Sequence, residues 1–150
     1  MISYTSILLA LIGTVGFCIL FQVPKKSMVF SAMCGALGWS VYILCQNYDI
    51  TSGVAAFSAA AVVAIAGEIL ARTRKEAVTI FVIPGILPLV PGMGIYYCMF
   101  NFLSGNEAKA AYWGEQTLII AGAIALGILV VSSLVRSGSK IISSRRRAKN

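Results

Sequence analysis

Charged side chains are scarce in this sequence, and two of them stand together at the end of an apolar run. Glu68 follows Gly67, and Arg72 lies four residues further on. A carboxylate inside or beside a membrane is costly and often serves in proton relays or ion coupling. The same i, i+4 spacing is also that of an ordinary ion pair on one helix face. Glu68 and Arg72 are therefore candidates for coupling or gating, with a simple ion pair as the alternative.

The second informative pattern is a segment rich in proline and glycine within an uncharged run. Three of the four prolines fall within eight residues. Proline lacks an amide donor and clashes with the carbonyl four residues before it, so the carbonyls of Ile80, Pro84 and Leu87 should lose their helical bonds. Ile83, Leu87 and Val90 each precede a proline and are expected outside the α region. We therefore predict a helix that unwinds for a turn or more. The residues expected to shape the break are Pro84, Gly85, Pro88, Pro91 and Gly92.

Composition predicts the elements that must position these residues. Of the 150 residues, 59% are hydrophobic and 11% are charged, whereas a soluble domain carries roughly a quarter charged residues. Five charge-free runs each have about the ~20 residues that a membrane helix needs. We predict an all-α, polytopic membrane protein, with one membrane domain over residues 1–136 and a basic tail over residues 137–150. The five expected spans are approximately Ser3–Val23, Ser27–Gln46, Gly53–Ala71, Ala77–Leu103 and Gln116–Arg136.

The basic residues predict the orientation of these spans. The loops after the first and third spans and the C-terminal segment hold 11 of the 12 Lys and Arg residues, and the opposite side holds only Lys109. Because Lys and Arg mark the cytoplasmic side, the N-terminus should lie outside and the C-terminus in the cytoplasm. The tail serves as a topology anchor, as a contact for anionic membrane lipids, or as both.

The fourth expected span is too long for one straight crossing. Its 27 residues would measure ~40 Å as a helix, and the hydrocarbon core is only ~30 Å thick. The break begins about seven residues from the cytoplasmic end, at or slightly inside mid-membrane depth. Backbone left unpaired there must be buried in protein or line a water-filled cavity, and discontinuous helices form substrate sites in transporters. The segment is therefore either part of such a site or a kink that packs without a ligand.

Small and aromatic residues predict how the spans pack. Ala56, Ala60 and Ala64 recur every fourth residue, the spacing of a stripe that lets a second helix approach closely. Tyrosines and a tryptophan gather on the predicted outer side, as in an interfacial aromatic belt. They are Tyr42, Tyr48, Tyr96, Tyr97, Tyr112 and Trp113.

Two other function classes are disfavoured by the sequence. The basic residues lie in short loops and at the C-terminus, whereas nucleic-acid binding uses a basic face on a soluble fold. The sequence has no histidine, no paired intramembrane carboxylates and no nucleophile–base arrangement, so an enzyme is not expected. Its four cysteines lack metal-ligand spacing, and we expect neither a metal nor a cofactor.

The pattern Gly67-Glu68-x-x-Ala71-Arg72, followed by the Pro84–Gly92 segment and Tyr96, resembles a known family. It is similar to the C-terminal half of the bacterial threonine/serine exporter family (ThrE-type), and above all to the stand-alone small subunits of its split members (YjjB-like). The resemblance extends over essentially the whole chain. It implies export of small hydrophilic metabolites across the bacterial cytoplasmic (inner) membrane, driven by the membrane potential or the proton gradient.

The same resemblance implies a cargo class and a partner. Fused members carry threonine and serine, and split pairs have been linked to small dicarboxylates such as succinate. Split members work with a separate subunit that resembles the N-terminal half of the family (YjjP-like). The alternative is an accessory subunit that stabilises a partner holding the whole pathway. Homo-oligomerisation is left open.

Overall fold

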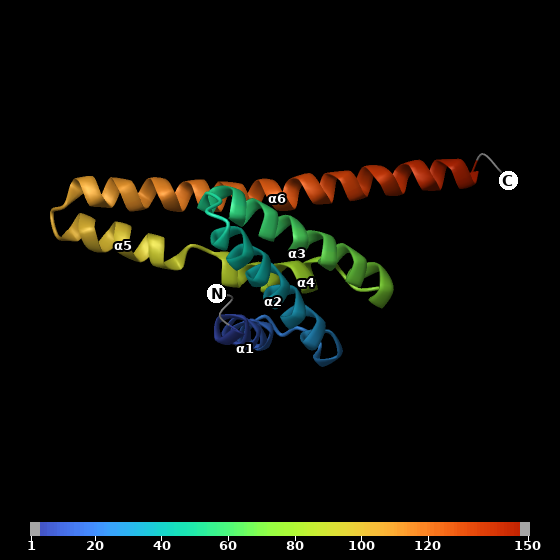
Figure 1. The fold of residues 1–150 in the computed structure, drawn as a ribbon. Helices are drawn as coiled ribbons and strands as arrows, with labels where there is room; N and C mark the ends of the chain where they lie inside the picture. Colours follow the sequence, from blue (N-terminus) through green and yellow to red (C-terminus); the bar gives the residue numbers. More distant parts are fainter. Residues whose placement is uncertain (1–3, 148–150) are drawn as a thin grey trace.

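The computed structural model describes residues 4–147 of the chain, and within that range the regular elements are all helices (Figure 1). The predicted all-α fold class is therefore confirmed. The elements are α1 (Tyr4–Leu20), α2 (Lys25–Asn47), α3 (Ser52–Arg74), α4 (Thr79–Ile86), the short 3-10 helix η1 (Leu87–Leu89), α5 (Gly92–Leu103) and α6 (Glu107–Arg147).

The helices before α5 pack around α2. This helix contacts α1 and α3, its neighbours in the chain, and also α4 and η1. Because α4 contacts α3 as well, the short helix is held among its neighbours (Figure 1). Phe81 of α4, Val63 of α3 and Cys34 of α2 are all fully buried. These side chains mark the core of what we call the N-terminal bundle, residues 4–89.

The predicted alanine stripe is confirmed as a packing surface of α3. Ala56, Ala60 and Ala64 are buried. Gly127 of α6 lies against this surface, and a Cβ added to it would come within 2.7 Å of the carbonyl oxygen of Phe57. With so little side chain between them, the backbones of α3 and α6 come into direct contact.

Local residues set the loops between the helices. Lys75 adopts a left-handed conformation (φ 56°) directly after α3, and its amide bonds the carbonyl of Ala71. Gly105 (φ 73°) turns the chain between α5 and α6, where glycine avoids the cost that a Cβ would carry. The side chain of Asn106 then accepts a bond from the amide of Lys109 at 3.2 Å, and so caps the start of α6.

Length and composition allow several of the described helices to cross a membrane. α2, α3 and the Glu107–Val135 part of α6 qualify as straight spans, and α4–η1 with α5 form one pair bent by 47°. The described part of the first predicted span is a shorter apolar helix of 17 residues. The predicted fifth span, Gln116–Arg136, is the middle of a single helix of 41 residues. The number of crossings and their orientation stay predictions.

α5 and the first part of α6 extend away from the bundle, beyond the ends of α2 and α3 (Figure 1). We call this element the α5/α6 hairpin, residues 92–117. The two helices approach each other closely at Gly94, because a Cβ added there would lie 2.3 Å from Oγ1 of Thr117. The ring centroids of Tyr97 and Trp113 lie 5.0 Å apart. Among the described residues of α5, none is buried.

Candidate functional site

The break in the fourth predicted span is shorter than expected. α4 continues through Pro84, and η1 contains Pro88, so within the fully described stretch from Thr79 to Leu103 only Val90 and Pro91 lie outside a helix. Val90 is extended (φ −62°, ψ 128°), and the amide of Gly92 bonds its carbonyl at 2.8 Å. Pro91 (φ −78°, ψ 59°) is thus the centre of an inverse γ-turn. The predicted unwinding across a turn or more is therefore wrong: two residues carry the bend.

The expectation for residues before proline holds at only one of three positions. Val90 is extended as predicted. Leu87, however, is helical (φ −54°, ψ −37°), and Ile83 lies inside α4. Proline disfavours the α region for the residue before it without forbidding it. Here the contacts of α4 with α2 and α3 hold the helix together.

Each carbonyl that the prolines deprive of a helical partner finds another donor. The hydroxyl of Ser31 donates to the carbonyl of Ile80 at 2.9 Å. The carbonyl of Pro84 accepts from the amide of Leu87, and the carbonyl of Leu87 accepts from the amide of Val90 at 3.2 Å. The prediction that the three carbonyls lose their α-helical hydrogen bonds together is thus correct. Each of the three, however, accepts a different hydrogen bond instead. Ser31 is fully buried on α2, and no pattern in the sequence connected it to Ile80.

The five predicted pathway residues occupy different environments. Pro84 and Gly85 are buried, Pro88 and Pro91 are half-buried, and Gly92 is exposed. Gly85 packs tightly against its neighbours, since an added Cβ would lie 3.0 Å from Cγ1 of Val63 and 3.1 Å from Cβ of Cys34. At Gly92 an added Cβ would meet no described atom within 4 Å.

Two cavities flank the proline-containing helix. One, of about 270 Å³, is lined by Ser6, Leu9, Ala10, Trp39 and Pro88. The other, of about 370 Å³, lies beside Pro84 and is lined by the α1–α2 loop together with Thr79, Ile80 and Ile83. Among the described side chains the indole Nε1 of Trp39 is buried without a hydrogen-bond partner. An unpaired buried donor is unfavourable by about 1–3 kcal/mol, so Trp39, which lines the first cavity, carries an unsatisfied indole N–H.

Glu68 and Arg72 are not brought together. Glu68 is half-buried and forms no ion pair or hydrogen bond with any described residue, and Arg72 is exposed. The carboxylate that does have a partner is Glu76, which accepts a hydrogen bond from the hydroxyl of the fully buried Ser27. Sequence reasoning missed this pair, because the two residues are 49 positions apart. Within the described chain, no three His, Cys, Asp or Glu side chains come close enough to hold a metal ion.

Comparison with known proteins decides the family. Residues 6–134 match the family described as "Threonine/Serine exporter, ThrE". The chain belongs to the threonine/serine exporter family. The resemblance expected from the Glu68 and Pro84–Gly92 motifs is thereby confirmed, and membership together with the long apolar helices makes this a membrane protein of a transport family.

A second comparison shows how much of a longer relative this chain matches. An uncharacterized protein of Haemophilus influenzae is 29% identical over 129 residues, which cover 81% of this chain and 43% of that relative. This exporter-family chain therefore spans less than half the length of the relative. No solved structure matches it significantly.

Proposed function

We propose that this chain is one subunit of an exporter for small hydrophilic metabolites in the bacterial cytoplasmic membrane. Its cargo would be amino acids of the threonine/serine type or small dicarboxylates such as succinate. The observation that carries the proposal is the bent helix pair α4–η1 and α5, whose proline-containing half is enclosed by α1, α2 and α3 with a cavity on either side. A two-residue bend next to cavities is the kind of hinge that alternating access uses.

The proposed topology has five spans, with the N-terminus outside and the C-terminus in the cytoplasm. The Ser27–Glu76 bond supports it, because it joins the start of α2 to the α3–α4 loop. This contact gathers Lys25, Lys26 and Lys75 at one end of the bundle. Such a basic end is what the cytoplasmic side of a membrane protein requires.

In this proposal the residues have separate roles. Pro84, Gly85, Pro88, Pro91 and Gly92 shape the pathway. Glu68 couples transport to the proton gradient or the membrane potential. Because its carboxylate has no partner among the described residues, its protonation would break no bond within the subunit. Arg72 is exposed on the following turn and would contribute to gating.

The proposal includes a second membrane subunit that resembles the N-terminal half of the family (YjjP-like). The length of the Haemophilus relative supports it, because more than half of that protein has no counterpart here. The competing candidate is an accessory role, in which the partner holds the whole pathway.

Efflux from preloaded cells that lack their own exporters tests the proposal. Threonine, serine and succinate efflux is measured with this chain alone, with the partner candidate alone and with both. Efflux of one cargo only when both chains are present would establish a split exporter. Full efflux from the partner alone would reduce this chain to an accessory, and no efflux with both chains verified in the membrane would refute the cargo assignment.

Two variants separate pathway from accessory roles at equal expression. In the proposed exporter, Glu68→Gln removes the coupling carboxylate and Pro88→Ala straightens the helix before the bend, so both lower the efflux rate. An accessory subunit predicts unchanged efflux for both variants. Asp49→Asn, in the exposed α2–α3 loop, is the matched control for loss of a carboxylate.

A further inference from the structure

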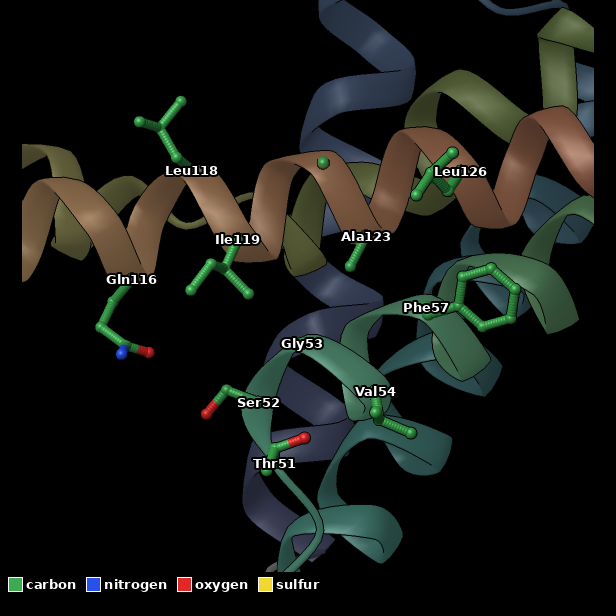
Figure 2. A pocket seen from close by; sticks show the side chains of 11 residues that line it. Thr51, Ser52, Gly53, Val54, Phe57, Gln116, Leu118, Ile119, Ala123 and Leu126 are labelled. Atoms are coloured by element: carbon green, nitrogen blue, oxygen red, sulfur yellow. The ribbon is translucent and has the colours of Figure 1, made fainter.

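Two apolar hollows lie next to each other along α6. One hollow of about 800 Å³ lies between α6 and the start of α3, where Ile119 and Ala123 point toward α3 (Figure 2). Val54, Phe57 and Leu126 also line it. A second hollow of about 710 Å³ lies between α6 and α5. Leu118 and Ile119 line both, so the two hollows adjoin along α6, and we call them together the α6 groove.

The shape of the groove fits a helix. Its lining on α6 runs from Glu107 to Leu126, which is about 28 Å at 1.5 Å per residue. That length is close to the ~30 Å that a membrane helix crosses. α3 forms the wall of the first hollow and α5 the wall of the second, and most of the lining of both is apolar. A hydrophilic cargo would gain little from such a surface, whereas an apolar helix would pack against it.

Gly122, which lines the groove, has free space where a side chain would begin. Between residues 107 and 135, α6 has three glycines. A Cβ on Gly114 would lie 3.3 Å from the sulfur of Cys98, and one on Gly127 would lie 2.7 Å from the carbonyl oxygen of Phe57. On Gly122 it would meet no described atom within 4 Å. Since small residues permit close helix approach, Gly122 offers a contact position that the described chain does not fill.

The α5 side of the groove combines exposed aromatic side chains with charged residues nearby. The uncharged stretch of α6, Gln116–Val135, is long enough for one crossing of the hydrocarbon core. Cys98 lies beside Gly114, so the rest of α5 runs alongside the charged residues 107–115, beyond that stretch. There Phe100 and Phe102 are 55% and 63% exposed. An exposed apolar patch of this kind is a candidate contact surface for another protein as well as for lipid.

We propose that this groove, along α6 between α3 and α5, binds a transmembrane helix of the partner subunit. The inference rests on the second subunit of the proposed function. The occupant is the counterpart of the part of the longer relative that this chain lacks, which is more than half of that protein. A second copy fits less well, because a two-fold interface would set the same concave surface against itself. Two such surfaces facing each other would leave an empty space between the two copies, whereas a single helix would fill the groove of one copy.

Matched glycine-to-tryptophan variants test the groove. Gly122→Trp fills its floor, and Gly13→Trp places the same side chain on α1, where an added Cβ also meets no described atom within 4 Å. Each variant is co-expressed with the tagged partner candidate, and the subunit retained with it is measured after detergent extraction. We expect Gly122→Trp to lower retention about tenfold, from overpacking at the interface, and Gly13→Trp to leave it unchanged. Both isolated variants should elute as the unmodified subunit does.

A photo-reactive residue at Leu118, with a control at Ile12 on α1, identifies the neighbour directly. A cross-link from position 118 to the partner supports the proposal. A cross-link only to a second copy, or only to lipid, overturns it. Full retention of Gly122→Trp in a pair that does form overturns the groove while leaving the proposed exporter intact. Failure of the unmodified chains to associate at all overturns the partner, and the groove with it.

Discussion

The N-terminal bundle and the α5/α6 hairpin bury their apolar side chains very differently. In the bundle, Gly85 and Gly67 are places where side chains of neighbouring helices press against the backbone. Phe81 is fully buried. In the hairpin, none of the described residues of α5 is buried, and Phe102 is 63% exposed.

The bundle buries its apolar side chains through contacts within the chain. The hairpin leaves many of its apolar side chains exposed. The bundle pairs the three carbonyls that its prolines deprive of helical bonds, so its bent helix is held by contacts within the subunit. In the hairpin, α5 packs mainly against the first part of α6 and presents apolar side chains outward. The bend is therefore held by the chain's own contacts, whereas the hairpin lines part of the surface that we propose for the partner.

The largest expected effect contrasts two phenylalanines. Phe81→Ala should lower the free energy of unfolding by about 3–5 kcal/mol, because a fully buried ring leaves a cavity. Phe102→Ala should change it by less than about 0.5 kcal/mol, because that ring is exposed in the isolated subunit. Unfolding of the purified subunit in mixed micelles measures both. Similar losses for the two variants would contradict the contrast between bundle and hairpin.

A smaller effect is expected at the bond that repairs the helix at Pro84. Ser31→Ala removes the hydroxyl that donates to the carbonyl of Ile80, which should lower the free energy of unfolding by about 2 kcal/mol. Pro84→Ala restores an amide that can donate to the same carbonyl. In that background Ser31→Ala should therefore cost much less. The double-mutant cycle measures this coupling, and equal losses in both backgrounds would show that Ser31 does not replace the missing amide.

Local patterns in the sequence predicted the helices and the position of the bend. The alanine spacing of α3 and the three prolines act through contacts and geometry within a few residues, which a sequence displays directly. The extent of the break was overestimated, because proline rules describe an isolated helix. Ser31 and the packing of α4 against α2 and α3 pair the backbone again, and these contacts connect residues far apart in the chain.

The candidate carboxylate shows the same limit. Glu68 and Arg72 have ion-pair spacing, but the structure leaves Glu68 without a partner among the described residues. Glu76, in the α3–α4 loop, accepts a hydrogen bond from the hydroxyl of Ser27 in α2. Spacing along one helix states which side chains share a face, and only the packing of helices decides which of them meet.

The Ser27–Glu76 bond should contribute about 1 kcal/mol, as a half-buried hydrogen bond does. Ser27→Ala and Glu76→Ala should each lower the free energy of unfolding by that amount, and the double variant should lose little more than either one. Glu68→Ala is the matched control, and its loss should simply add to that of Ser27→Ala. Micelle unfolding of the three single variants and of the two double variants, Ser27→Ala with Glu76→Ala and Ser27→Ala with Glu68→Ala, measures the coupling. Strict additivity for the Ser27 and Glu76 pair would mean that the bond contributes nothing.

The smallest expected effect lies on α6 and has the opposite sign. Gly122→Ala adds a methyl group where no described atom lies within 4 Å, and alanine favours a helix over glycine. The isolated subunit should gain about 0.5 kcal/mol of unfolding free energy. Gly127→Ala, five residues along the same helix, forces a Cβ to 2.7 Å from the carbonyl oxygen of Phe57 and should destabilise the subunit. If Gly122→Ala destabilises the isolated subunit as well, then position 122 is already packed within the chain and its groove is closed.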